Sequence, residues 1–441
     1  MEGDIGSITI DQSQLNRVSG LLNLEEDKLN EIAESFQKEL RKGLENEGQM
    51  IKALPTFITE LPSGHEQGEY LVVDLGGSNL RVGCVKLLGE GKFELNRIKW
   101  QLKEEILGAS GEQMFGFIAD CILEYLRLQI VSEKLKNLWE KKEQGTLGFT
   151  FSYPVKQEKL AHGILLQWSK AIKNTDVIGT DIVVVLQSAL AAKGLGNIKV
   201  VALLNDTVGT LMANAYRDPR TKIAVILGTG TNCAYVEDAG KIKKLGSAVD
   251  GQMIVNVEWG AFGDDKPELL PATCAETIVD GKSENPGKQL FEKMVSGMYL
   301  GRIANEFLYC LTGTRSSFDA KKLSTIAATA PCKIASEKED LSTHELNCIL
   351  CKVKKVCGLV VQRSAQLCAA LIAGIYRSQG SPRARTVVAF DGSLYELYPG
   401  YPEMLKCFVD KLDPENSLEF QVGKDESMIG AAVVLATSSN R

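Results

Sequence analysis

Histidine is scarce in this chain, with only His65, His162 and His344 among 441 residues. His65 lies in the turn-like segment PSGHEQG, and His162 directly precedes a glycine. An enzyme that activates a nucleophile through histidine needs an imidazole held beside that nucleophile. None of the three histidines lies in a motif of that kind, so the sequence gives no support to a histidine-dependent mechanism.

Positive charge is also in short supply. The chain has 50 Lys and Arg against 56 Asp and Glu, a formal net charge of -6. Nucleic-acid binding needs clustered basic residues. The one basic run, residues 134–142, is interrupted by Leu135, Leu138 and Trp139 at helical spacing, which is typical of a solvated helix face. We therefore expect no nucleic-acid partner.

Leaders, membrane spans and disulfide patterns are missing as well. The start, MEGDIGS, lacks the apolar core of a signal peptide. By inspection, no stretch of the sequence is apolar enough to span a membrane. The eleven cysteines are scattered without the spacing of a disulfide framework, which suits a reducing compartment. The sequence predicts a cytoplasmic protein with no membrane partner.

One group of cysteines leaves two interpretations open. Cys348, Cys351 and Cys357, with His344 one turn upstream, have the residue types of a zinc site. The same segment carries apolar residues at helical spacing: Leu346, Ile349, Leu350, Val353 and Val356. We favour thiols on a buried helix over a metal site.

Length and pattern point to two related halves. A chain of 441 residues with 44% hydrophobic content can build two cores. The sequence Asn23-x-x-Glu26 reads as a capping box opening an amphipathic helix. Farther on, 70–85 reads as strand, Gly-rich turn, strand, and 222–236 repeats that design. This repeat indicates an internal duplication.

The two Gly-rich turns have the composition of phosphate loops. Glycines let backbone N–H groups approach an anion closely, and neighbouring hydroxyl or guanidinium groups add donors. Either turn alone would be an ordinary hairpin, but the pair predicts a two-sided phosphate clamp. The residues concerned are Asp74, Gly76, Gly77, Ser78, Asn79 and Arg81 in the first turn, and Gly228, Thr229, Gly230, Thr231 and Asn232 in the second.

An Asn-Asp pair follows an apolar strand at 201–204. Asn205 and Asp206 would then lie at the carboxyl end of a strand, where open α/β sheets bind ligands. An amide and a carboxylate can bind neighbouring hydroxyls, and the carboxylate can accept a proton from one of them. Asn-Asp is also a common turn dipeptide, so the pair carries weight only together with other motifs.

Those motifs occur in a recognisable order. The segments LVVDLGGSNLRVGCV, LGFTFSYPV, WSK, LLNDTVGTL, ILGTGTNCAY, VNVEWGAFGD and NPGKQLFEKMVSGMYLG span most of the chain. In order and approximate spacing they resemble the eukaryotic hexokinase family, with wording most like the fungal hexokinases and glucokinases. The resemblance covers about Asn23 to Ala436 and implies an α/β, two-domain, actin-like (ribonuclease-H-like) ATPase fold. The active-site cleft would lie between a small domain, 69–205 plus 425–441, and a large domain, 1–68 plus 206–424.

The resemblance also implies an activity, transfer of the γ-phosphate of MgATP to the 6-hydroxyl of glucose or a related hexose, the first step of glycolysis. Asp206 would be the general base, and Lys170 would neutralise charge on the transferring group. Residues matching the family's sugar contacts are Ser152, Ser169, Lys170, Asn205, Asp206, Asn232, Glu258 and Glu292. Both Gly-rich turns, with Gly392 and Ser393, would bind ATP. Asp74 and Asp206 would hold Mg²⁺ through water, and the protein would be a monomer or homodimer.

Two departures and several alternatives accompany this resemblance. Where the family has an acid followed by Gly-Ser-Gly-x-Gly, this chain has Asp425-Glu426-Ser427-Met428-Ile429-Gly430, which would place bulk near the adenine. Arg302 stands where Glu is common. An N-acetylhexosamine kinase, a sugar-binding regulatory protein with little turnover and an actin-like ATPase remain alternatives. Because each motif occurs once, we expect one catalytic unit.

Overall fold

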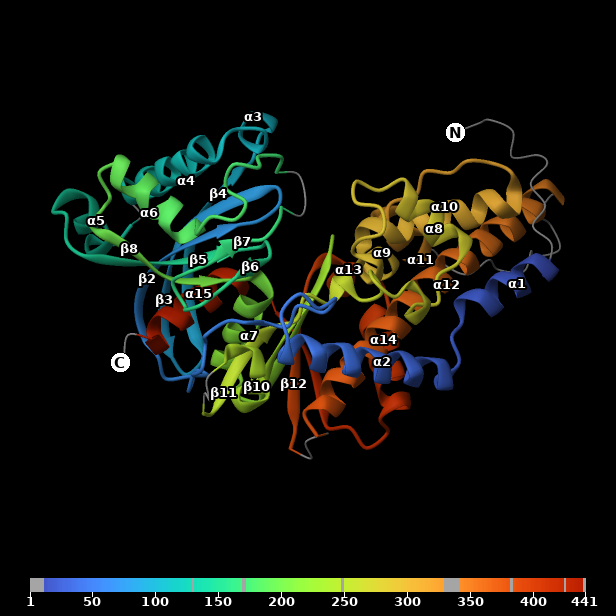
Figure 1. Ribbon diagram of the computed structural model, residues 1–441. Coiled ribbons are helices and arrows are strands. Elements are labelled where there is room, and N and C mark those ends of the chain that lie inside the picture. The colour runs from blue at the N-terminus through green and yellow to red at the C-terminus, as the bar shows by residue number, and fades with distance from the viewer. Residues whose placement is uncertain are drawn as a thin grey trace.

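The computed structural model describes residues 12–128, 131–168, 172–246, 250–328, 341–380, 384–423 and 426–438. The chain folds around two mixed sheets, and a large group of helices lies beside the second one (Figure 1). Each sheet has its own apolar cluster, and a third cluster fills the space between them.

The first sheet has the strand order β4-β3-β2-β5-β8. Its strands are β2 (Gln67–Leu75), β3 (Asn79–Gly89), β4 (Lys92–Gln101), β5 (Gly145–Phe151) and β8 (Ile198–Leu204). β2, β3 and β4 form an antiparallel meander, whereas β2, β5 and β8 run parallel. The three parallel strands therefore end at one edge of the sheet, where open α/β sheets place their ligands. A two-stranded ribbon of β6 (Val155–Lys156) and β7 (Ile164–Leu165) follows β5.

The second sheet repeats this connectivity. Its order is β1-β11-β10-β9-β12-β13, with β9, β10 and β11 antiparallel and β9, β12 and β13 parallel. The strands are β1 (Leu54–Pro55), β9 (Thr221–Leu227), β10 (Thr231–Asp238), β11 (Gln252–Asn256), β12 (Thr386–Asp391) and β13 (Leu418–Val422). Apart from the edge strand β1, both sheets have their first five strands in the order 3-2-1-4-5. This shared order confirms the predicted internal duplication.

Two helices pack against each other between the sheets, α7 (Asp206–Arg217) and α15 (Glu426–Ser438). A methyl group added at Gly430 would lie 2.0 Å from the carbonyl oxygen of Gly209, so the two backbones touch. α15 packs on strands of the first sheet and α7 on strands of the second (Figure 1). The strands and α15 are compatible with the predicted domain limits, which stay a prediction.

The remaining helices flank the two sheets. The first sheet carries α3 (Glu104–Leu107), α4 (Gly111–Leu126), α5 (Glu133–Glu140) and α6 (Ile182–Ala192). The second half carries α1 (Gln12–Leu22), α2 (Glu26–Glu45), α8 (Cys274–Gly281), α9 (Leu290–Val295), α10 (Gly297–Thr312), α11 (Ala320–Ala328), α12 (Leu341–Ser378), α13 (Ser393–Leu397) and α14 (Tyr401–Leu412). Short 3-10 turns are η1 (Ala239–Lys241), η2 (Lys243–Leu245), η3 (Trp259–Ala261) and η4 (Pro267–Leu269).

The opening helix α2 follows the predicted periodicity but not the predicted cap. Leu29, Ile32, Phe36 and Leu40 are buried, as the pattern indicates. The capping box is wrong, because Glu25 is the N-cap and makes no side-chain cap. The Asn23 side chain instead accepts a hydrogen bond from Gln362 of α12 at 2.7 Å. A tertiary contact has taken the side chain that the local motif would have used.

The expectation that no segment could span a membrane is wrong on length and composition. Cys351–Ser378 of α12 is long and apolar enough, and its most apolar 18-residue window has a mean hydropathy of 1.6. In this structure 83% of its most apolar window is buried inside the protein. It also carries Arg363, fully buried and paired with Glu276 of α8. Such burial is what a central core helix requires.

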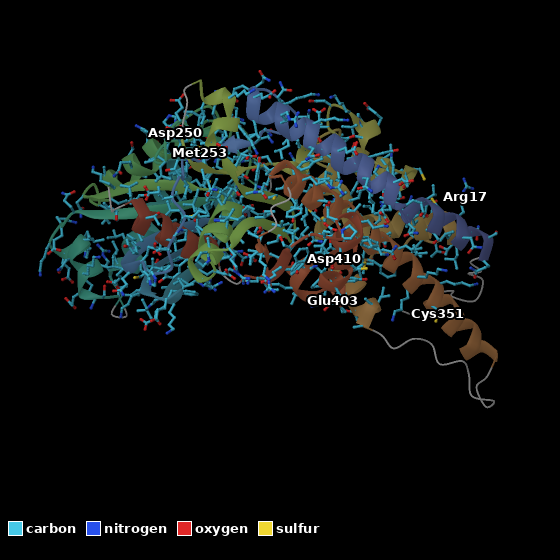
Figure 2. All side chains as sticks on the ribbon, turned by 90° about the horizontal axis from the view of Figure 1, so that it is seen from below. Arg17, Asp250, Met253, Cys351, Glu403 and Asp410 are labelled. Carbon is cyan, nitrogen blue, oxygen red and sulfur yellow. The ribbon has the colours of Figure 1, made fainter. Side chains whose placement is uncertain are left out.

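The cysteines of α12 lie in two environments. Cys357 is buried, and burial raises the pKa of its thiol to about 12. Cys351 is exposed, and Figure 2 shows it on the part of α12 that projects from the body. The side chains of Cys348 and His344 lie outside the described part of the chain. The choice between helix thiols and a metal site therefore stays a prediction.

Candidate active site

Polar residues gather where the parallel strands of the first sheet end. Asp74 of β2 pairs with Thr150 of β5, and Thr150 pairs with Leu204 of β8, so the three strands end together. Asn205 and Asp206 come directly after β8 and begin α7. The predicted position of the Asn-Asp pair at a strand's carboxyl end is therefore correct.

Asn205 and Asp206 have different partners. The Asn205 side chain is the N-cap of α7 and accepts from the backbone N–H of Thr207 at 3.0 Å. Asp206 Oδ1 accepts from the same N–H at 2.8 Å and from the Thr207 hydroxyl at 3.3 Å. Among the described residues none donates to Asp206 Oδ2. The partly exposed carboxylate thus has one oxygen bound at the N-terminus of α7, while its other oxygen receives no hydrogen bond from the described part of the chain.

Asp74 is a buried acid close to Asp206. Its Oδ2 accepts from Arg81 at 2.5 Å and from the hydroxyl of Ser427 at 3.2 Å. Burial raises the pKa of the Asp74 carboxyl, the nearby charge of Asp206 raises it further, and Arg81 opposes both. Among the described residues none donates to Asp74 Oδ1. Two neighbouring carboxylates, each with an uncommitted oxygen, match the ligands that Mg²⁺ takes from proteins.

An amide and carboxylate cluster joins the two halves of the chain. Asn232 of β10 donates from Nδ2 to Glu258 Oε1 at 3.1 Å, to Asn256 Oδ1 at 2.8 Å and to Asn205 Oδ1 at 3.4 Å. Asn256 Nδ2 also donates to Glu258 Oε1, at 2.9 Å. Three residues predicted to bind sugar, Asn205, Asn232 and Glu258, thus lie within one hydrogen-bonded cluster.

Asn256 is the member that sequence reasoning missed. It lies in β11 between Val255 and Val257, and only 4% of its surface is exposed. An asparagine at a buried strand position two residues before a predicted sugar ligand was the available signal. The turn that follows puts Glu258 in the left-handed region, with φ of 58°. This unusual conformation directs the Glu258 backbone N–H to Asn232 Oδ1 at 3.1 Å.

Glu292 connects the predicted sugar site to the second Gly-rich turn. Its Oε2 accepts from the backbone N–H of Thr231 at 3.0 Å. A Cβ at Gly230 would lie 2.6 Å from the same oxygen, so any larger residue there would require the Glu292 carboxylate to move. The Thr231 hydroxyl in turn accepts from the indole of Trp259 at 3.0 Å. Glu292 is therefore in direct contact with a predicted phosphate-binding residue.

The second turn also meets the predicted adenosine turn. Gly392, with φ of 120°, leaves no room for a Cβ, which would lie 2.5 Å from the Leu227 carbonyl carbon. On the other side Gly297 N donates to Gly228 O at 2.8 Å, and Met298 N donates to Thr229 O at 3.3 Å. The Met298 side chain is 45% exposed beside this turn. Met298 is a second candidate site residue, beside the predicted phosphate-binding turn, that sequence reasoning missed.

The first turn contacts the segment after β5. Gly76 N donates to Asn79 O at 3.0 Å and closes the hairpin. The Tyr153 hydroxyl donates to Gly76 O at 3.2 Å, and Tyr153 stacks edge-on against Trp168. Ser152 is 7% exposed at the end of the same strand. Ser169 and Lys170 lie outside the described residues, so their predicted roles have no structural account.

In the atypical segment 425–430, the described side chains of Ser427 and Met428 make contacts other than those expected. Met428 does not add bulk at an adenine pocket, because its side chain is 1% exposed and packs in the apolar cluster between the sheets, against Gly83 of β3. Ser427 bonds to Asp74, and its carbonyl accepts from Thr150 at 3.1 Å. Arg302 lies over the ring of Tyr299, 5.2 Å from its centre.

Two protein-family models, both described as hexokinase, match this chain, one over residues 14–216 and one over 222–437. The chain belongs to the hexokinase family. The crystal structure of a hexokinase from Schistosoma mansoni complexed with glucose has a TM-score of 0.83 and 31% identity, covering 97% of this chain and 100% of that one. The chain therefore has the two-domain, actin-like fold that the sequence predicted.

Curated relatives are similar across the whole chain but are longer. Human hexokinase HKDC1 is 38% identical, over 97% of this chain and 49% of that protein. Human hexokinase-3 is 36% identical, over 94% of this chain and 46% of that protein. The chain spans about half the length of the curated relatives it matches. The narrower resemblance of this chain to fungal members of the family stays a prediction.

Proposed function

We propose that this protein is an ATP-dependent hexose kinase that makes a hexose 6-phosphate, with glucose as the expected substrate. The observation that supports this most is the hydrogen-bonded cluster of Asn205, Asn232, Asn256 and Glu258, placed beside Asp206 at the junction of the two sheets. Clustered amides and carboxylates suit a ligand with several adjacent hydroxyl groups. The glucose bound to the Schistosoma mansoni enzyme is a ligand of that kind.

Asp206 is the proposed general base. Its Oδ1 is held at the N-terminus of α7 by two donors of Thr207, which fixes the orientation of the carboxylate. Its other oxygen would accept the proton of the hexose 6-hydroxyl as that oxygen attacks the γ-phosphate. Phosphoryl transfer depends on positioning and charge stabilisation, and no covalent intermediate is required. Lys170 would neutralise charge on the transferring group.

ATP and Mg²⁺ are the proposed phosphate donor and metal. The backbone N–H groups of both Gly-rich turns, with Ser78, Arg81 and Thr229, would bind the phosphates. Asp74 and Asp206 fit a magnesium site, since Mg²⁺ keeps several waters and takes one or two carboxylates. The ion would balance negative charge on the phosphates. Met298, apolar and exposed beside Thr229, would contact the nucleotide base.

The test is a set of coupled assays of ADP release with glucose, fructose, mannose and N-acetylglucosamine. We expect the highest kcat/KM for a plain hexose. Asp206→Asn should lower kcat by about 10²–10⁴, the usual contribution of a positioned general base, while Asp265→Asn at an exposed position should not. Strong ATP hydrolysis without sugar, or near-normal turnover by Asp206→Asn, would contradict the proposal. A higher kcat/KM for N-acetylglucosamine than for the plain hexoses would instead indicate a hexosamine kinase.

We also propose a cytoplasmic location and a monomer or homodimer. Support for the location comes from the nine cysteines within the described residues, all of which are free thiols. Fluorescent tagging of the full-length protein tests the location, and sedimentation equilibrium tests the oligomeric state.

A further inference from the structure

The helix that carries Glu292 is too short to set its own orientation. α9 has six residues, fewer than two turns, and isolated helices of that length are unstable in water. Its position must therefore come from contacts at its ends and along its buried side. At the first residue, Leu290 N donates to Asp264 Oδ1 at 2.9 Å. Beyond the last residue, Gly297 N donates to Gly228 O.

The buried side of α9 is held by an ion pair next to Glu292. The Lys293 side chain is 3% exposed, and its ammonium donates to Asp280 Oδ1 at 2.6 Å and to Asn285 O at 2.7 Å. Asp280 also accepts from the backbone N–H of Gly287, at 3.1 Å to Oδ1 and 3.0 Å to Oδ2. One carboxylate thus connects α8, the 281–289 loop and α9.

The Lys293–Asp280 ion pair limits the positions that the Glu292 side chain can take. Lys293 directly follows Glu292, and the backbone turns into α9 at Gln289, which is in the left-handed region with φ of 57°. A shift of Lys293 within the core would move the adjacent Glu292 carboxylate away from Thr231 N and from a bound sugar. Small displacements of a binding group lower affinity and rate steeply.

We propose that the Lys293–Asp280 ion pair is a positioning device for the sugar site, with Lys293 acting through Glu292 and never touching the substrate. The proposal rests on the hexose kinase function proposed above. It assigns a role in hexose affinity to two residues that the sugar-binding motifs do not include. A merely structural pair would change stability alone.

The experiment is a double-mutant cycle on the full chain, with hexose dissociation constants measured by calorimetry in the absence of ATP. Lys293→Met and Asp280→Asn should each weaken hexose binding about tenfold, at a temperature where circular dichroism shows both variants folded. Asp280→Asn leaves a buried ammonium without its anion, so Lys293→Met/Asp280→Asn should bind hexose no more weakly than Asp280→Asn alone. ATP binding should change less than twofold in all three.

A matched control is Lys282→Met, which removes the ion pair of Lys282 with Glu306 at 2.7 Å in the neighbouring helices and should leave hexose affinity unchanged. Wild-type hexose affinity in folded Lys293→Met would overturn the proposal. So would losses that multiply in the double variant, because the two residues would then act independently. If the wild-type protein binds no hexose, the proposed function fails, which is a separate result.

Discussion

Asn232 and Glu258 hold each other through two hydrogen bonds of equal length. Asn232 Nδ2 donates to Glu258 Oε1 at 3.1 Å, and the backbone N–H of Glu258 donates to Asn232 Oδ1 at 3.1 Å. Asn232 lies in β10, directly after the second Gly-rich turn, and Glu258 follows β11. The pair therefore joins two segments of the second sheet. The relationship fixes which Glu258 oxygen is left for a ligand.

Glu258→Gln tests that assignment. With Oε1 already engaged by Asn232 and Asn256, the amide nitrogen of Gln would face the sugar and present a donor where an acceptor is needed. We expect the hexose KM to rise about 10- to 100-fold, with a smaller effect on kcat, because a hydrogen bond to a charged group is lost in a desolvated site. Steady-state kinetics with varied hexose measure this.

Two companion variants sharpen the test of Glu258. Asn256→Ala should raise the hexose KM as well, since it removes a donor to Oε1. Glu94→Gln on an exposed part of β4 should leave every kinetic constant unchanged. An unaltered hexose KM in both Glu258→Gln and Asn256→Ala would remove this cluster from the sugar site.

Intrinsic fluorescence should report hexose binding mainly through Trp168. Its indole donates to Asn174 Oδ1 at 3.0 Å, and its ring is half-buried beside Tyr153, two residues from Lys170. Trp259 is fully buried between Phe36 and Phe291, so its surroundings have little room to change. A saturable emission change on adding glucose should disappear in Trp168→Phe and persist in Trp259→Phe. The reverse pattern would show that the core around Trp259 moves instead.

Met428→Ala should lower stability without acting at the nucleotide site. Removing a side chain that is 1% exposed leaves a cavity, and Met-to-Ala changes in cores cost about 2–5 kcal/mol. Denaturant unfolding and the ATP KM are the measurements. Val184→Ala, on a 58% exposed side chain, is the control and should change stability by no more than about 0.5 kcal/mol. A changed ATP KM with unchanged stability would support the sequence-based prediction that Met428 lies near the adenine.

Asp218 should make stability depend on acid pH. Its side-chain hydrogen bond with Arg220 is the largest influence and lowers the pKa of the Asp218 carboxyl from 3.8 to about 2. A carboxyl with a lowered folded pKa stabilises the fold above its unfolded pKa, and this contribution is lost as pH falls toward the folded value. The difference in Tm between wild type and Asp218→Asn should be constant down to about pH 5 and narrow below pH 4. Asp265→Asn, which removes an exposed ion pair, should differ from wild type by the same small amount in Tm at every pH.

Local sequence was sufficient to place several strands, the two Gly-rich turns and the Asn-Asp pair at a strand's end. Glycine occurs in turns where backbone has to approach closely, as at Gly392, where a Cβ would clash with the backbone of Leu227. Apolar runs on either side of a Gly-rich turn located β2, β3, β9 and β10, whose central residues are largely buried. Helical spacing located α2, which buries one face. Asn205 and Asp206 follow from the same logic, since a strand's end and a helix's start are local features.

Tertiary structure alone decided which polar side chains meet. Asn23 had the spacing of a helix cap, yet Gln362, 339 residues away, bonds to it instead. The pairing of β11 with β10 places Asn256 in the candidate site, which the sequence did not predict. The packing of α15 on β3 directs Met428 into the apolar core, away from the adenine site where the sequence placed it. By length and composition the apolar stretch of α12 could span a membrane, and only the structure shows that most of it is buried inside the protein. A sequence specifies the period of burial along each element, whereas the partner that covers each face comes from segments hundreds of residues apart.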